Sequence, residues 1–222
     1  MSAVPTSGPR ELERLIVKNV PRDALMACED AYHGGDTKGR LHAAAFELGH
    51  RPSAAGQVKH FFTNEAFHEA LQAHGAEPSP LRGTRLVVGR LGIFNIARLN
   101  VPGHKWVSLR RSATRKKLAE LNQAIESKYV QGDFFAAAPE VSGGTLFILG
   151  VVDGVDANRI AQLTQVMVAL PAPDMASWLY ISTMAEFLKL YDQPDTSIQP
   201  DNAVPKLKRQ PKEQTGDDQG NQ

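Results

Sequence analysis

The sequence contains little cysteine and no long apolar run. Only Cys28 is a cysteine among the 222 residues, which excludes an internal disulfide framework and a cysteine-rich zinc site. No apolar stretch reaches the roughly 20 residues that a membrane-spanning helix needs. The first residues, MSAVPTSGPREL, lack the basic and apolar blocks of a signal peptide. We therefore expect a cytoplasmic chain without a membrane partner.

Acidic residues are missing from the middle of the chain. No Asp or Glu stands between Glu77 and Glu120, although the whole chain has 24 acidic residues. This acid-free segment holds ten basic residues: Arg82, Arg85, Arg90, Arg98, Lys105, Arg110, Arg111, Arg115, Lys116 and Lys117. The remainder of the chain carries 15 basic and 24 acidic residues, which the overall net charge of +1 conceals. This separation of basic from acidic residues indicates that the basic segment faces an anionic partner or an acidic surface of the same chain. It carries no information about the fold.

Local composition divides the chain into five regions. Residues 1–8 and 193–222 are polar, contain proline and are expected to be disordered. Residues 9–77 show helical patterns, and residues 78–83 form a turn-rich linker. Residues 84–192 combine strand and helix patterns and are predicted to form an α+β domain. Whether the helical region folds as a separate domain is left open by the sequence.

The helical region is predicted to contain short helices. We expect one helix to end at Gly34–Gly35, another to end near Gly49, a third over residues 54–62 and a fourth from Thr63 to Gly75. After residue 84 the patterns predict about three strands, a helix, two strands and a final helix. Parallel pairing would require regular helical crossovers, so we predict an antiparallel sheet with two packed helices.

A helix-turn-helix pattern lies within the helical region. This motif needs a small residue on its first helix, a glycine at the turn four positions later and an apolar residue on the recognition helix. Ala45, Gly49 and Val58 occupy these positions. The predicted recognition helix would present residues that pair with bases or phosphates: Arg51, Ser53, Gln57, Lys59 and His60. An Ala-rich helical hairpin without any DNA contact is the alternative.

The acid-free segment is a second candidate for nucleic-acid binding. Phe94 and Trp106 stand among its arginines, a combination that can track phosphates and stack bases. The candidate contacts are Arg98, Lys105, Arg110, Arg111, Arg115 and Lys116. Cations crowd the start of the helix predicted after Ser112, where the helix dipole favours an anion. We therefore expect an anion site near Ser112 to Lys117; the alternative is a solvated basic face with both aromatic residues in the core.

No catalytic, metal or cofactor site is predicted. Glu47 with His50 and Glu65 with His68 have the spacing that carboxylate-bridged di-iron bundles use, but His50 lies at a helix end, where such ligands do not occur. No phosphate-binding loop or nucleophile elbow is present. The sequence therefore gives no reason to assign an enzyme.

Three hypotheses follow for function. The first is a small cytoplasmic DNA-binding or regulatory protein, with a homodimer as one arrangement of its chains. The alternative is a protein-interaction module whose basic face binds an acidic protein partner. A further alternative is an enzyme that acts on a phosphorylated substrate held near Ser112.

Overall fold

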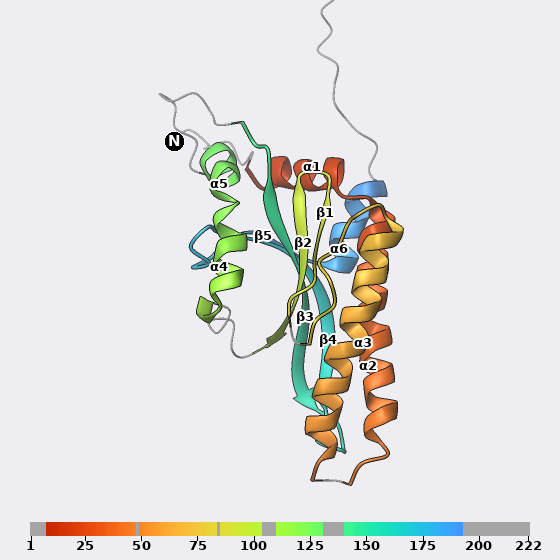
Figure 1. Ribbon diagram of the computed structural model, residues 1–222. Coiled ribbons are helices and arrows are strands. Elements are labelled where there is room, and N and C mark those ends of the chain that lie inside the picture. Colours follow the sequence, from red (N-terminus) through yellow and green to blue (C-terminus); the bar gives the residue numbers. More distant parts are fainter. Residues whose placement is uncertain (1–7, 48, 84, 104–109, 131–139, 193–222) are drawn as a thin grey trace, which may run out of the picture. The chain divides into compact units, whose positions relative to one another are not determined.

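The fold was determined as a computed structural model, shown in Figure 1. The structure describes residues 8–47, 49–83, 85–103, 110–130 and 140–192. The chain divides into two units, Met1–Asp192 and Gln193–Gln222, and every described residue belongs to the first. The disorder predicted for residues 1–8 and 193–222 falls outside the described residues except at Gly8, which is the first residue of α1. The candidate contacts Lys105 and Trp106 also lie outside the described residues.

Helices and one mixed five-stranded sheet make up the described part of the chain, which confirms the α+β prediction. The helices are α1 Gly8–Asn19, α2 Arg22–Ala43, α3 Arg51–Ala73, α4 Ala113–Glu120, α5 Gln123–Tyr129 and α6 Met184–Leu188, followed by a 3-10 turn, Lys189–Asp192. The strands are β1 Val88–Leu91, β2 Phe94–Pro102, β3 Gly144–Val155, β4 Ala161–Pro171 and β5 Trp178–Thr183. In the described ranges no helix is both long and apolar enough to cross a bilayer.

The long helices α2 and α3 form a hairpin in place of the short helices predicted for this region (Figure 1). The prediction that a helix ends at Gly34–Gly35 is wrong, because these residues lie inside α2. Glycine allows the two helices to approach closely here. A Cβ atom on Gly35 would lie 2.1 Å from Thr63 Oγ1, and one on Gly39 would lie 2.2 Å from Lys59 Cγ.

The sheet has the strand order β1-β2-β3-β4-β5. Strands β2 and β3 pair in parallel, whereas the other neighbouring strands pair antiparallel. The prediction of a wholly antiparallel sheet is therefore wrong at its centre. The chain segment with α4 and α5 connects β2 to β3, so the single predicted helix is the crossover that a parallel pair requires.

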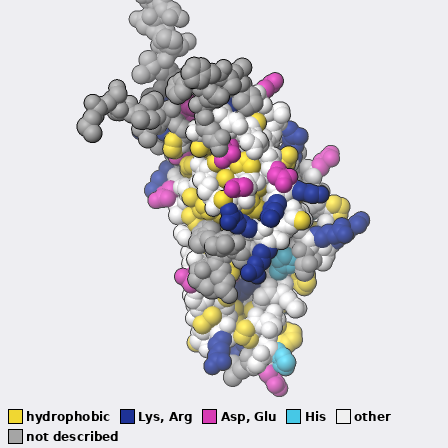
Figure 2. All heavy atoms as spheres, turned by 90° about the vertical axis from the view of Figure 1, so that its left-hand side faces the viewer, with side chains coloured by type: hydrophobic (Ala, Val, Ile, Leu, Met, Phe, Trp, Pro, Cys, Tyr) yellow, Lys and Arg dark blue, Asp and Glu magenta, His cyan; other side chains and the backbone are white. Residues whose placement is uncertain are grey.

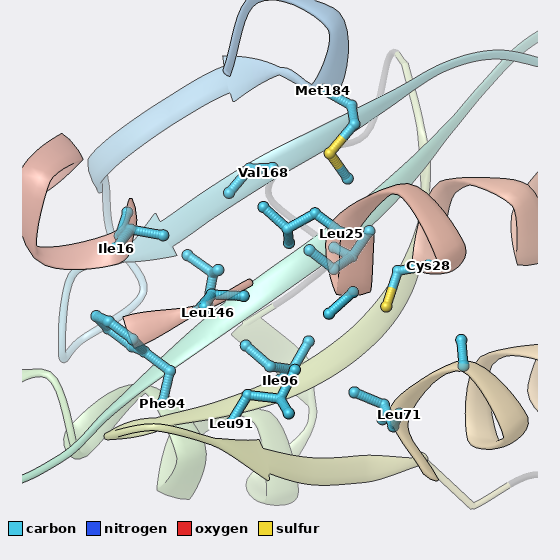
Figure 3. Packing of buried hydrophobic residues seen from close by; sticks show 14 of the residues in the cluster. Ile16, Leu25, Cys28, Leu71, Leu91, Phe94, Ile96, Leu146, Val168 and Met184 are labelled. Carbon is cyan, nitrogen blue, oxygen red and sulfur yellow. The ribbon is translucent and has the colours of Figure 1, made fainter. Parts of the chain in front are cut away.

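Both faces of the sheet are covered. Helices α1, α2, α3 and α6 pack on one face, where Leu25 and Leu71 meet Ile96, Leu146 and Val168 from the strands (Figure 3). The opposite face is formed by the alternate strand positions, which pack against α4: Ala97, Leu99, Phe147 and Leu149 form one buried cluster with Ala119. Residues that alternate along β2 therefore point to different helical layers.

Candidate anion-binding pocket

A polar pocket lies beside β2 at the point where β1 begins. Strand β1 pairs with β2 only from Phe94 to Ala97, so β1 does not cover the second half of β2. A pocket of about 670 Å³ occupies this place, between α3, the chain before β1, β2 and the start of α4. Its lining residues are His60, Asn64, Arg85, Leu86, Arg98, Leu99, Asn100, Ser112, Thr114 and Arg115. We call it the anion pocket.

The lining of the anion pocket is basic. Arg85, Arg98 and Arg115 come from three stretches of the acid-free segment that lie far apart in the sequence. None of the described lining residues is acidic. The fold therefore gathers positive charge at one place without a neutralising carboxylate in the described lining.

Arg98 is the most buried charged residue of this pocket. Its position on β2 shares a face with Ile96, so the guanidinium points toward α3, and the residue is only 3% exposed. Its Nε donates to Asn64 Oδ1 at 2.6 Å, and its Nη2 donates to His60 Nδ1 at 2.9 Å and to the His60 carbonyl at 3.0 Å. Its Nη1 makes a weaker contact, at 3.4 Å, with Asn100 Oδ1. Neutral groups thus fix the guanidinium without neutralising it.

Burial of this charge perturbs two pKa values. Desolvation lowers the pKa of Arg98, and in the described ranges no carboxylate forms an ion pair with it. Desolvation, followed by repulsion from Arg98, lowers the pKa of His60. A guanidinium only donates, so His60 Nδ1 accepts from Arg98, while Asn64 Nδ2 lies 3.2 Å from Nε2 on the other side of the ring. His60 is therefore a neutral acceptor at physiological pH.

Tyr32 supports Arg98 from α2. Its ring centroid lies 5.8 Å from the Arg98 guanidinium carbon. Its hydroxyl lies 2.9 Å from the Leu99 carbonyl and 2.8 Å from the Ile148 carbonyl, which connects α2 to both strands of the parallel pair. A Cβ atom on Gly150 would meet the Tyr32 ring at 2.3 Å, so glycine is needed there. Burial raises the pKa of Tyr32 to about 12, so it remains a neutral donor.

The first turn of α4 borders the pocket. Ser112 caps this helix: its Oγ accepts from the Arg115 amide at 3.4 Å, and its carbonyl accepts from the Lys116 amide at 3.1 Å. The first turn contains no acidic residue. Burial lowers the pKa of the half-buried Arg115. Cations at a helix start are unfavourable unless an anion is bound there, so the positive end of α4 adds to the pocket's charge.

Comparison with protein-family models, with curated proteins and with solved structures gives no match.

A second, smaller pocket lies beside the first but lacks unpaired charge in the described residues. Its volume is about 130 Å³, and its charged lining residues are Asp36 and Lys59. Lys59 Nζ lies 2.5 Å from Asp36 Oδ1 and donates to the Ala161 carbonyl at 2.8 Å, while Arg40 pairs with Asp36 and Asp156. These contacts hold the α2–α3 hairpin to the β3–β4 connection and serve structure.

The helix-turn-helix is not confirmed. Ala45 lies beyond the end of α2, and Lys59 points into the contacts just described. His60 faces the anion pocket, and Arg51 donates to the Phe46 carbonyl at 2.9 Å and to Asn158 Oδ1 at 3.3 Å. The remaining members of the predicted recognition set, Ser53 and Gln57, are exposed on α3. The set therefore does not form one outward-facing row of polar side chains.

The other predicted contacts are divided between the pocket and the surface near α4. Arg98 and Arg115 line the pocket, whereas Arg110, Arg111 and Lys116 are exposed beside it. Arg110 Nε donates to the Met175 carbonyl at 3.1 Å. Phe94 is fully buried, so the alternative that placed it in the core is correct and it cannot stack a base.

Sequence reasoning missed the neutral members of the pocket. Asn64, Asn100 and Thr114 carry no motif and come from separate elements. One signal was available in the strand alternation: Arg98 follows Ile96 at an inward position, where an apolar residue is expected. In the described ranges no three His, Cys, Asp or Glu side chains lie close enough together to hold a metal ion.

Proposed function

We propose that this chain is a nucleic-acid-binding protein, in a DNA-binding or regulatory role, and that it binds through the anion pocket and the basic surface around α4. The observation that carries the proposal is the convergence of Arg85, Arg98 and Arg115 on a pocket whose described lining has no acid. The buried Arg98 guanidinium, held by neutral partners, favours an anion as ligand, because the anion supplies the missing counter-charge.

The surrounding charge favours a polymer of phosphates. Exposed Arg111, Lys116 and Lys117 extend the positive surface beyond the pocket. Figure 2 shows Lys and Arg side chains grouped across the middle of the face that carries α4 and α5. A single phosphate carries at most two negative charges, whereas a strand places phosphates at regular intervals along such a surface.

The proposal is tested by salt-dependent binding. Fluorescence anisotropy with labelled single-stranded and duplex oligonucleotides, titrated between low and high salt, measures affinity and its salt slope. Affinity should fall steeply with salt, because each neutralised phosphate releases a counterion. The double variant Arg85→Gln/Arg115→Gln should bind at least about tenfold more weakly at low salt, since two phosphate contacts are lost.

A matched control removes the same charge elsewhere. Arg14 and Lys18 lie on α1 and do not line the pocket, so Arg14→Gln/Lys18→Gln should retain nearly the original affinity. Equal losses in both double variants would show that net charge alone matters, and would contradict a role for the pocket. Binding of an acidic protein but of no oligonucleotide would contradict the nucleic-acid proposal itself.

A further inference from the structure

We infer that the anion pocket binds the phosphorylated end of a nucleic-acid strand, a phosphate monoester, and not a phosphodiester from within a strand. The inference rests on the proposed function and makes it more specific. It assigns recognition of a strand end to Arg98, Arg115 and the first turn of α4.

Burial of Arg98 limits which phosphates can reach it. The residue is almost fully buried between its own strand, β2, and helix α3. An internal phosphodiester is flanked by two sugars, and both flanking chains would have to enter the pocket with it. A terminal phosphate projects from one sugar only, so it can reach a buried floor while the strand remains on the basic surface.

The charge of the lining is the second argument. Three arginines line the pocket, and the described lining has no acid. An internal phosphodiester carries one negative charge, whereas a phosphate monoester carries between about 1.5 and 2 at pH 7. The monoester therefore neutralises more of the positive charge of the arginines. Its electrostatic advantage over the diester is larger in a partly desolvated site, where charges interact more strongly.

The donors that remain are the third argument. A guanidinium has five N–H donors, and the structure gives four contacts to Arg98, of which the one from Nη1 is long. This leaves the Nη1 edge able to donate to a ligand. The first N–H groups of a helix have no acceptor within it, so the amides of Ala113 and Thr114 at the start of α4 can donate outward. Three terminal phosphate oxygens match these donors.

The test compares strands that differ only at their ends. Three labelled single strands of one sequence carry a 5′-phosphate, a 3′-phosphate or hydroxyls at both ends, and anisotropy measures their affinities at fixed salt. One of the phosphorylated strands should bind at least about tenfold more tightly than the hydroxyl strand, a difference of about 1.4 kcal/mol. Adenosine 5′-monophosphate should compete only at a much higher concentration, because it lacks the strand that the basic surface holds.

Two pocket variants and one surface variant locate the effect. Arg115→Gln and Arg98→Lys should reduce the preference for the phosphorylated strand to less than about threefold, since each removes or displaces a guanidinium contact. Arg111→Gln changes an exposed arginine outside the pocket, so it should weaken phosphorylated and hydroxyl strands by the same factor. Thermal melting establishes that each variant is folded, and Arg115→Gln suffices if Arg98→Lys is not.

The outcomes separate this inference from the proposed function. Equal affinity for phosphorylated and hydroxyl strands would overturn the inference and leave nucleic-acid binding intact. A preference that survives unchanged in Arg115→Gln would also overturn it. Competition by adenosine 5′-monophosphate as strong as by the strand would overturn the assignment to a strand end, and binding of none of the three strands would overturn both proposals.

Discussion

Arg98 occupies an inward strand position that ordinarily holds an apolar side chain. Its contacts with Asn64, His60 and Asn100 satisfy donors but leave its charge without a counter-ion in the described residues. A buried charge held only by neutral groups reduces stability, because transfer of an ion out of water costs several kcal/mol. The fold tolerates this arrangement, which is typical of residues kept for binding.

Arg98→Met should leave the free energy of unfolding within about 1 kcal/mol of the original, because relief of desolvation offsets the acceptors left unpaired on His60 and Asn64. The same variant should lose most of its oligonucleotide affinity. Urea denaturation and anisotropy measure the two effects. A loss of stability above about 3 kcal/mol would show that Arg98 serves the fold first.

His60 should make stability depend on pH. Its pKa is lowered in the folded state, so the unfolded chain takes up this proton first as the pH falls. The contribution is fully present above the unfolded pKa of about 6.5 and is lost as the pH falls through the lower folded pKa. His60→Asn, which retains an acceptor for Arg98, should lose less stability than the original protein between pH 7.5 and pH 5. If melting temperature falls by the same amount with pH in His60→Asn and in the original protein, His60 does not cause the pH dependence.

At the scale of elements, the α2–α3 hairpin depends on glycine for close packing. Gly35→Ala should destabilise the protein by about 1–3 kcal/mol, because its Cβ would overlap Thr63 Oγ1 and approach the Thr63 backbone nitrogen to 2.8 Å. Gly34 is the matched control: it lies in the same helix with no atom within 4 Å of its Cβ position. Gly34→Ala should therefore stabilise the protein by up to about 1 kcal/mol through helix propensity. Equal effects in thermal melts would contradict this packing.

A variant at Lys59 tests whether α3 serves the hairpin or reads DNA bases. Lys59→Gln should reduce stability by about 0.5–1 kcal/mol, since its ion pair with Asp36 is only partly exposed. It should leave oligonucleotide affinity nearly unchanged, as should Gln57→Ala on the exposed side of α3. Loss of affinity in both variants without loss of stability would favour base reading by α3.

Element types were more predictable than element lengths and pairings. The strands β3 and β4 and the final helix were predicted, because apolar and β-branched runs are typical of buried elements, whereas β5 was not counted among the strands. The glycines of α2 were misleading, because a glycine that ends a helix and one that admits a neighbouring helix look alike in a single sequence. The parallel β2–β3 pair was missed because pairing depends on contacts far apart along the chain.

For the whole molecule, the charge pattern predicted the region of the candidate site but not its form. The acid-free segment and the cations after Ser112 indicated an anion site, and three parts of that segment do line one pocket. The contribution of α3 could not be predicted, because His60 and Asn64 reach the pocket only through the packing of the hairpin on the sheet. The sequence gives the number and position of the charged residues, whereas their burial and their neutral hydrogen-bond partners depend on the fold.

Hydrogen exchange with and without a bound oligonucleotide locates the binding contact on the folded chain. Binding at the anion pocket should slow the exchange of the amides in the first turn of α4, residues 113–117, and leave residues 44–58 unchanged. Protection confined to residues 44–58, with none in α4, would contradict binding at the anion pocket and would favour the helix-turn-helix instead.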